Sequence, residues 1–132
     1  MTIELSYLAA TLILAFVQVM LPAVARTRLY GARWNAGPRD ETQPPPGPIT
    51  GRLERAQANL YETLPLFIAI VLIAHVADRN GTLTAWGAAL YFWARVVYVP
   101  LYAFGVPYVR SAAFFVAFVG LVLLFAGVLI PS

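Results

Sequence analysis

The sequence contains no cysteine, no lysine and only one histidine. The absence of cysteine excludes disulfide frameworks, thiolate zinc sites and cysteine nucleophiles. With one histidine and six carboxylates, we expect no dedicated metal site. Charged residues make up only 11% of the 132 residues, whereas a soluble domain has about 25%. This composition excludes a disordered chain and a basic nucleic-acid-binding tail, so we expect no nucleic-acid partner.

Long apolar segments dominate the chain, and apolar residues make up 61% of it. Four long segments carry a single charge or none: 5–25, 56–77, 80–109 and 111–132. A bilayer core of about 30 Å is crossed by roughly 20 helical residues. No basic residue precedes the first apolar run, so we expect a retained helix and not a cleaved signal peptide. The sequence therefore predicts one all-α integral membrane domain over 1–132, an antiparallel four-helix transmembrane bundle with spans near 4–25, 56–78, 82–104 and 110–130.

The segment 26–55 differs in kind, because it holds six of the nine arginines and five of the ten prolines. Its run Pro44-Pro45-Pro46-Gly47-Pro48 predicts an extended, non-helical loop. With four spans, this loop and the third connection share one side and carry seven arginines, against one on the other side. The positive-inside rule then places the loop in the cytoplasm and both termini on the opposite side. The arginine-only usage suggests a GC-rich bacterial genome, so we expect a bacterial inner membrane.

One polar stripe enters the second predicted span. Glu62 lies inside this span, and an ionisable residue there is costly and marks a functional site by default. Arg55, Asn59 and Glu62 are spaced i, i+4 and i+7, so they share one helix face, and Arg52 extends that face. The stripe combines guanidinium, amide and carboxylate groups.

A second polar stripe lies in the third predicted span. Arg95, Tyr98 and Tyr102 are spaced i, i+3 and i+7. Arg110 and Ser111 open the last span at the same rim of the membrane. We expect these groups and the first stripe to converge in the cytoplasmic half of the bundle.

Two interpretations of this convergence remain open. The first is a buried ion pair between Glu62 and Arg95 that only locks the helices, although such a pair is weak evidence for stability. The second is a site for an anionic or zwitterionic peptide-like ligand, because arginines bind carboxylates and Glu62 suits an ammonium group. An arginine beside a ligand thiol would favour the thiolate. The phenylalanines of the last span are interpreted more simply, as lipid-facing and packing residues: Phe114, Phe115, Phe118 and Phe125.

The stretch from Arg55 to Phe67, with the sequence RAQANLYETLPLF, closely resembles the second-helix signature of the MAPEG family. These are membrane-associated proteins in eicosanoid and glutathione metabolism, and they include leukotriene and prostaglandin synthases and microsomal glutathione transferases. The pattern Arg95-Val96-Val97-Tyr98, the later Tyr102 and the pair Arg110-Ser111 are also similar to the family. The resemblance covers essentially the whole chain and implies a homotrimer with glutathione sites between adjacent subunits.

The resemblance also implies roles for individual residues. Arg110 would stabilise the glutathione thiolate, with Ser111 beside it, and these two are the expected catalytic residues. Arg28 or Arg26 would be a first-helix arginine that reaches the ligand. The expected glutathione-binding residues are Arg28, Arg52, Arg55, Asn59, Glu62, Arg95, Tyr98 and Tyr102.

The expected function is that of a glutathione-dependent transferase or peroxidase acting on a lipophilic electrophile or a lipid hydroperoxide. The partners would be membrane lipid, a lipophilic small-molecule substrate and two further copies of the chain. The alternative is a non-catalytic lipid-binding or scaffold protein on the same fold. A small four-span transporter is disfavoured, because the intramembrane carboxylate lies in the second span and the first loop is long.

Overall fold

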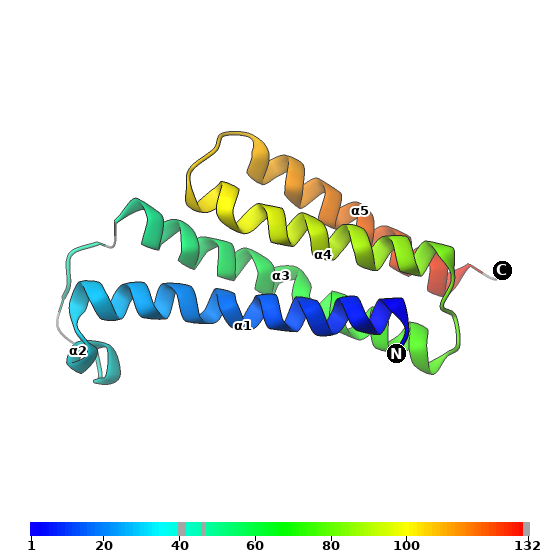
Figure 1. The fold of residues 1–132 in the computed structure, drawn as a ribbon, viewed down its shortest axis with the longest axis horizontal. Helices are drawn as coiled ribbons and strands as arrows, with labels where there is room; N and C mark the ends of the chain where they lie inside the picture. The colour runs from blue at the N-terminus through cyan, green and yellow to red at the C-terminus, as the bar shows by residue number, and fades with distance from the viewer. Residues whose placement is uncertain (40–41, 46, 131–132) are drawn as a thin grey trace.

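The computed structural model describes residues 1–39, 42–45 and 47–130, which form five α-helices and no strand. The all-α prediction is therefore confirmed for the described residues. Successive long helices run in opposite directions (Figure 1). The start of α1 and the end of α5 lie near the α3–α4 connection, and α2 lies at the other end of the molecule with the α4–α5 connection. The helices are α1 (Ile3–Tyr30), α2 (Ala32–Ala36), α3 (Pro48–Val76), α4 (Thr82–Ala103) and α5 (Val109–Leu129).

The connection between α1 and α3 is shorter than the loop predicted at 26–55. Helix α1 continues to Tyr30 and ends where Gly31 adopts a φ of 89°, a left-handed value that glycine reaches without steric cost. Helix α3 already begins at Pro48. The prediction ended the first helix too early and began the next one too late, because it took the whole arginine-rich segment as non-helical.

The proline run divides between the connection and the helix. Pro44, Pro45 and Gly47 are not helical, as expected, whereas Pro46 lies outside the described residues. Pro48 is the first residue of α3, where the missing N–H of proline would have no helical partner in any case. The expectation that Pro48 lies outside a helix is therefore wrong.

The core lies where the four long helices meet. Phe67 of α3 stacks on Tyr91 of α4, with ring centroids 4.1 Å apart and an interplanar angle of 15°. The Tyr91 hydroxyl shares a hydrogen bond of 2.8 Å with Thr63 Oγ1, so a phenol deep in the bundle has a polar partner. In the first turns of α4 and α1, Thr84 Oγ1 donates to the buried carboxylate of Glu4 at 3.0 Å, and this bond joins the two helices.

Helices α4 and α5 approach each other closely through glycine. A Cβ added at Gly87 would lie 2.6 Å from the carbonyl oxygen of Gly120, and one at Gly120 would lie 2.7 Å from that of Gly87. Because these neighbours are backbone atoms, no side-chain rotation could relieve the overlap. Small residues at this contact therefore set the distance between the two helices.

Three helices, α1, α3 and α5, are each long and apolar enough to cross a membrane. Their outer surfaces carry large apolar side chains, such as Ile13 and Phe16 at 67% exposed and Phe115 at 65%. Apolar surface of this extent requires lipid or protein contact. Helix α4 does not reach the same mean hydropathy, because it contains Arg95 and several tyrosines and tryptophans. Three of the four predicted spans thus fall in helices that are long and apolar enough to cross a membrane.

We predict that Gly87→Ala lowers the stability of the protein, because the added methyl group must push α5 away from α4. Overpacking of this kind typically costs about 1–3 kcal/mol. The measurement is the thermal unfolding midpoint in detergent, followed by circular dichroism. Gly81→Ala is the control, since nothing lies within 4 Å of its added Cβ and its backbone is extended. Equal midpoints for the two variants would contradict the close packing.

Candidate functional site

A buried guanidinium lies at the centre of the polar region. Arg95 of α4 is 1% exposed, and its Nη1 donates to Asn59 Oδ1 of α3 at 2.6 Å. Its Nη2 donates to the carbonyl oxygen of Ala56 at 3.4 Å, and its Cζ lies 4.4 Å from the centroid of the Tyr98 ring. Two acceptors from α3 and one ring from α4 therefore surround the charge. The predicted convergence of the two polar stripes is present here.

The interpretation as a Glu62–Arg95 ion pair is wrong for the single chain. Glu62 is exposed, and in the part of the chain that the structure describes the ion pair joins Arg26 to Glu54. Three residues of an α-helix turn by roughly 300°, so Asn59 and Glu62 point in directions about 60° apart. Asn59 faces α4 and takes the place expected for the carboxylate, which leaves Glu62 available to a group from outside the chain.

Tyr102 lies between two arginines at the end of α4. Arg55 Nε donates to its hydroxyl oxygen at 3.0 Å, and Arg110 Cζ lies 5.8 Å from the centroid of its ring. The Tyr98 and Tyr102 rings meet edge to face at 5.3 Å. Arg55 and Arg110 are both exposed, so donors of each guanidinium remain open to a ligand. The structure thus brings together Arg55 and Tyr102 from the predicted ligand set with the predicted catalytic arginine.

Two further polar atoms in this region are buried without a partner among the described residues. They are Nε of Arg95 and the hydroxyl oxygen of Tyr98. Buried donors and acceptors are costly when they are left unpaired. Their position beside Asn59 and Tyr102 adds unused hydrogen-bonding capacity to the region.

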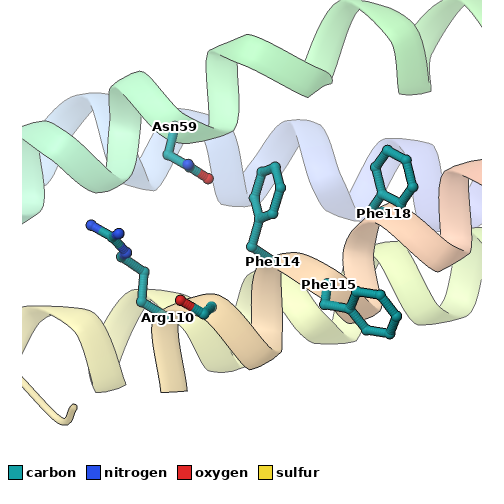
Figure 2. A pocket seen from close by; sticks show the side chains of 6 residues that line it. Asn59, Arg110, Phe114, Phe115 and Phe118 are labelled. Carbon is teal, nitrogen blue, oxygen red and sulfur yellow. The ribbon is translucent and has the colours of Figure 1, made fainter. Parts of the chain in front are cut away.

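A cavity of about 620 Å³ opens between α3 and α5. Its polar end is formed by Asn59, Arg110 and Ser111, and its other end is formed by phenylalanines of α5. Figure 2 shows the Phe114 ring pointing toward α3, between Asn59 and Phe118. The volume lies within the range of about 300–1,000 Å³ that is usual for small-molecule sites. One helix therefore supplies both the cationic and the apolar parts of the wall.

The phenylalanines were missed as site residues, because a run rich in phenylalanine in a membrane helix is most simply explained by lipid contact. Phe114 and Phe118 follow Arg110 at i+4 and i+8, and Phe115 follows Ser111 at i+4. That spacing places them on the same face as the predicted catalytic pair. The signal that identifies them is thus the position of Arg110 and not the apolar character of the helix.

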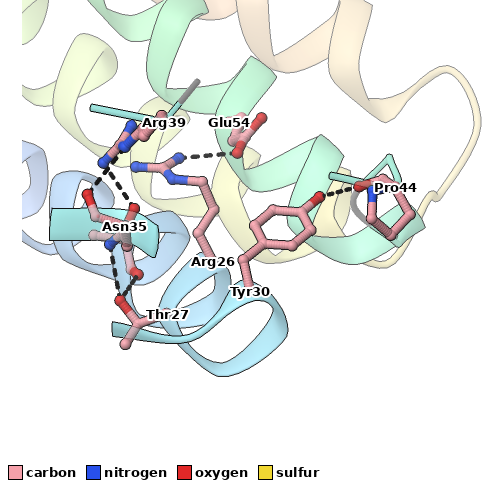
Figure 3. Close-up of polar contacts among 8 residues, drawn as sticks. Arg26, Thr27, Tyr30, Asn35, Arg39, Pro44 and Glu54 are labelled. Carbon is pink, nitrogen blue, oxygen red and sulfur yellow. Dashed lines mark hydrogen bonds and ion pairs between the residues drawn. The ribbon is translucent and has the colours of Figure 1, made fainter. Parts of the chain in front are cut away.

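The arginines expected at the ligand from the first helix lie elsewhere in the single chain. Arg26 Nη1 is held by Glu54 Oε1 at 2.9 Å (Figure 3). Arg28 is exposed and lines a separate, largely apolar cavity of about 610 Å³ between α1 and α3. Neither arginine lines the cavity that contains Arg110.

Hydrogen bonds within the α1–α3 connection, the connector, hold α2 against the end of α1. Asn35 Nδ2 donates to Thr27 Oγ1 at 2.9 Å, and Arg39 Nη2 donates to Asn35 Oδ1 at 2.7 Å (Figure 3). The Tyr30 hydroxyl donates to the carbonyl oxygen of Pro44. This folded connector fixes the end of α1 that carries Arg26 and Arg28.

Arg52 also lies away from the cavity. Its Nη1 is 3.5 Å from the carbonyl oxygen of Ala103, in the last turn of α4. The guanidinium is therefore placed against the carboxyl end of a neighbouring helix.

These features define an all-helical protein with membrane-crossing helices and an arginine- and tyrosine-rich site that adjoins an apolar cavity. The model of the MAPEG family matches residues 7–130, which is nearly the whole chain. The chain belongs to the MAPEG family. The comparisons with curated proteins and with solved structures gave no match.

We predict that Asn59→Ala destabilises the protein, because the buried guanidinium of Arg95 loses its shortest hydrogen bond. A hydrogen bond to a charged group contributes about 1.5–3 kcal/mol. The measurement is unfolding by sodium dodecyl sulfate in mixed micelles, followed by circular dichroism. Asn59→Asp keeps an acceptor at this position and is expected to retain most of the stability.

Gln57→Ala is the matched control for this experiment. Gln57 lies on the same turn of α3 and bonds to the exposed Tyr61 hydroxyl at 3.2 Å. If the Asn59 and Gln57 variants lost the same stability, the central position of the Arg95–Asn59 bond would be refuted.

Proposed function

We propose that this protein is an integral-membrane, glutathione-dependent transferase or peroxidase that acts on lipophilic electrophiles or lipid hydroperoxides. The observation that carries the proposal is the two-ended cavity, in which Arg110 and Ser111 adjoin a wall of phenylalanines. A charged cosubstrate and an apolar substrate could occupy the two ends at once. Membership of the MAPEG family, shown over residues 7–130, supports glutathione as the cosubstrate.

The residues present fit glutathione in both charge and hydrogen bonding. The exposed guanidiniums of Arg55 and Arg110 suit its carboxylates, which arginine binds in a bidentate manner. The exposed carboxylate of Glu62 suits its ammonium group, and Asn59 supplies an amide at the polar end of the cavity. When bound, glutathione supplies the thiol nucleophile that this cysteine-free chain lacks.

Arg110 is the residue that we assign to the sulfur. A guanidinium lowers the pKa of a neighbouring thiol, because it favours the charged form. Ser111 and Tyr102 are in place to donate a second hydrogen bond there. Tyr102 is already held by Arg55 at 3.0 Å, so its hydroxyl hydrogen is free to point away from that donor.

Chemistry at this site has two balanced forms. In the transferase reaction, the thiolate forms a sulfur–carbon bond with the electrophile. The bond from that carbon to the leaving group breaks, and the leaving group departs with the electron pair; in an epoxide, the ring oxygen keeps the pair and takes up a proton. In the peroxidase reaction, two molecules of glutathione are oxidised to the disulfide, and one hydroperoxide is reduced to an alcohol and water. In both, the protein contributes thiolate stabilisation and proximity.

We further propose that α4 is the fourth span and that three chains form a homotrimer. The 22 residues of α4 reach about 33 Å at a rise of 1.5 Å per residue, which is enough to cross a bilayer core of about 30 Å. Glu62 and Arg28 both face outward from the single chain, and neighbouring subunits would cover them. The arginine count favours a cytoplasmic α1–α3 connection with both termini on the other side of the membrane, which we propose to be a bacterial inner membrane.

The first test is a titration of the purified protein with glutathione at neutral pH, followed by the ultraviolet absorbance of the thiolate. We expect a saturable thiolate band in the wild type and its loss in Arg110→Ala. Arg79→Ala is the matched control, because Arg79 is an exposed arginine in the α3–α4 connection, at the other end of the molecule. It is expected to retain the band.

Two other outcomes would redirect the assignment. Binding of glutathione without a thiolate band would favour a non-catalytic lipid-binding or scaffold protein on the same fold. No binding at all would refute glutathione as the cosubstrate.

A second test examines the trimer through mixed subunits. Arg28 and Arg110 line different cavities of one chain, so a site that uses both must draw them from two chains. We expect the Arg28→Ala and Arg110→Ala proteins each to lack activity, and co-expression of the two to restore part of it. Failure of every mixed preparation, with both variants folded and associated, would contradict a site shared between subunits.

A further inference from the structure

Arg52 contacts the turn between α4 and α5 with the flat face of its guanidinium. Its Nη1 lies 3.5 Å from the carbonyl oxygen of Ala103. A Cβ added at Gly105 would lie 2.7 Å from Cζ of Arg52, so the guanidinium rests directly on the Cα of this glycine. The side chain is half-buried. These contacts join the first turns of α3 to the last turn of α4.

The turn itself has the hydrogen bonds of a Schellman motif. Val106 N donates to the carbonyl oxygen of Leu101 at 3.0 Å, and Gly105 N donates to that of Tyr102 at 2.9 Å. Gly105 has a φ of 72°, the left-handed value that this motif requires. The carbonyl of Ala103 takes no part in these two bonds, and Arg52 supplies its donor. A cation at the carboxyl end of a helix is also favoured by the helix dipole.

The residues of the candidate site that flank this turn in the sequence are Tyr102 and Arg110. Tyr102 precedes Gly105 by one turn of helix, and Arg110 follows it at the start of α5. The path of the chain between them decides where Arg110 stands relative to α3. Arg55, one turn after Arg52 on α3, already binds the Tyr102 hydroxyl. Arg52 and Arg55 thus attach the same helix to the same turn at two points.

We propose that Arg52 is a positioning residue, which holds the α4–α5 turn against α3 and thereby places Arg110 at the polar end of the cavity. It does not bind the ligand. The inference rests on the proposed function in so far as Arg110 stabilises a thiolate. It replaces the role of ligand-binding residue that the family resemblance implies for Arg52.

The contact with the turn is tested by a double-mutant cycle that needs no ligand. Gly105→Ala must displace the guanidinium in the wild type, but it has no guanidinium to displace in Arg52→Ala. The thermal midpoint is therefore expected to fall less in the double variant than the sum of the two single falls. Non-additivity is the usual sign of direct contact between two residues.

Gly31→Ala is the matched control for the cycle. Gly31 also has a left-handed φ, 89°, but nothing lies within 4 Å of its added Cβ. Its effect is expected to be the same in the wild type and in Arg52→Ala. An additive cycle for Gly105 would overturn the proposal.

The role toward Arg110 is tested with bound glutathione. Arg52→Ala is expected to raise the pH midpoint of the thiolate absorbance by about one unit, which is roughly a tenfold weaker stabilisation of the thiolate. Arg52→Lys keeps a donor for the Ala103 carbonyl and is expected to recover part of this shift. A variant whose midpoint does not move would overturn the proposal.

A carboxylate-esterified glutathione distinguishes positioning from ligand binding. If Arg52 bound a carboxylate of glutathione, its loss would weaken binding of the acid and leave binding of the ester unchanged. We expect the ratio of the two affinities to stay constant in Arg52→Ala and to fall in Arg55→Ala. A fall in Arg52→Ala would overturn the inference alone, whereas the absence of any thiolate in the wild type would refute the proposed function together with this role of Arg52.

Discussion

Arg95 carries a guanidinium that is 1% exposed, and a charge buried so completely needs acceptors from outside its own helix. Asn59 Oδ1 and the Ala56 carbonyl oxygen supply them from α3, and the Tyr98 ring covers the charge from α4. These contacts fix the rotation of α3 about its axis. Once Asn59 faces α4, Glu62 stays exposed, and Arg55 reaches Tyr102. The polarity of the site therefore follows from one buried charge.

The candidate site belongs to three helices, but its cavity has only two of them as walls. α3 contributes Asn59, and α5 contributes the remaining lining residues, while α4 holds Arg95 and its tyrosines behind them. Helices α4 and α5 pack closely through Gly87 and Gly120, so they hold the residues of the site as one unit. Helix α1 contributes no residue to the lining of this cavity, and a separate cavity lies where α1 meets α3. A site lined by two helices is suited to completion by a second chain and to lateral access from lipid.

The sequence predicted the number and order of the long helices, because uncharged runs of this length have few alternatives in a membrane. It also predicted which polar residues would converge, since residues spaced by three, four or seven share a helix face. It could not predict that Asn59 and not Glu62 would face Arg95, because both lie on the predicted stripe and only packing decides between them. The end of α1 and the start of α3 were also missed, since hydropathy identifies the part of a helix that lies in the bilayer and not the polar turns that extend beyond it. Phe114 and Phe118 were interpreted as lipid-facing and packing residues, because hydropathy cannot distinguish a cavity wall from an outer surface.

The burial of Arg95 also bears on how the chain enters the membrane during synthesis. A lone arginine at the centre of an inserting helix costs about 2.5–3.5 kcal/mol on scales derived from cellular insertion. Helix α4, which carries Arg95, is the long helix that does not reach the hydropathy of the three candidate spans. Its acceptors lie on α3, which leaves the ribosome earlier and is joined to α4 by a short connection. If α4 is the fourth span, as proposed above, α3 and α4 would insert as a hairpin in which the amide of Asn59 solvates the charge before lipid surrounds it. The residue that organises the finished site would then also act as the signal that pairs these two helices on their way into the bilayer.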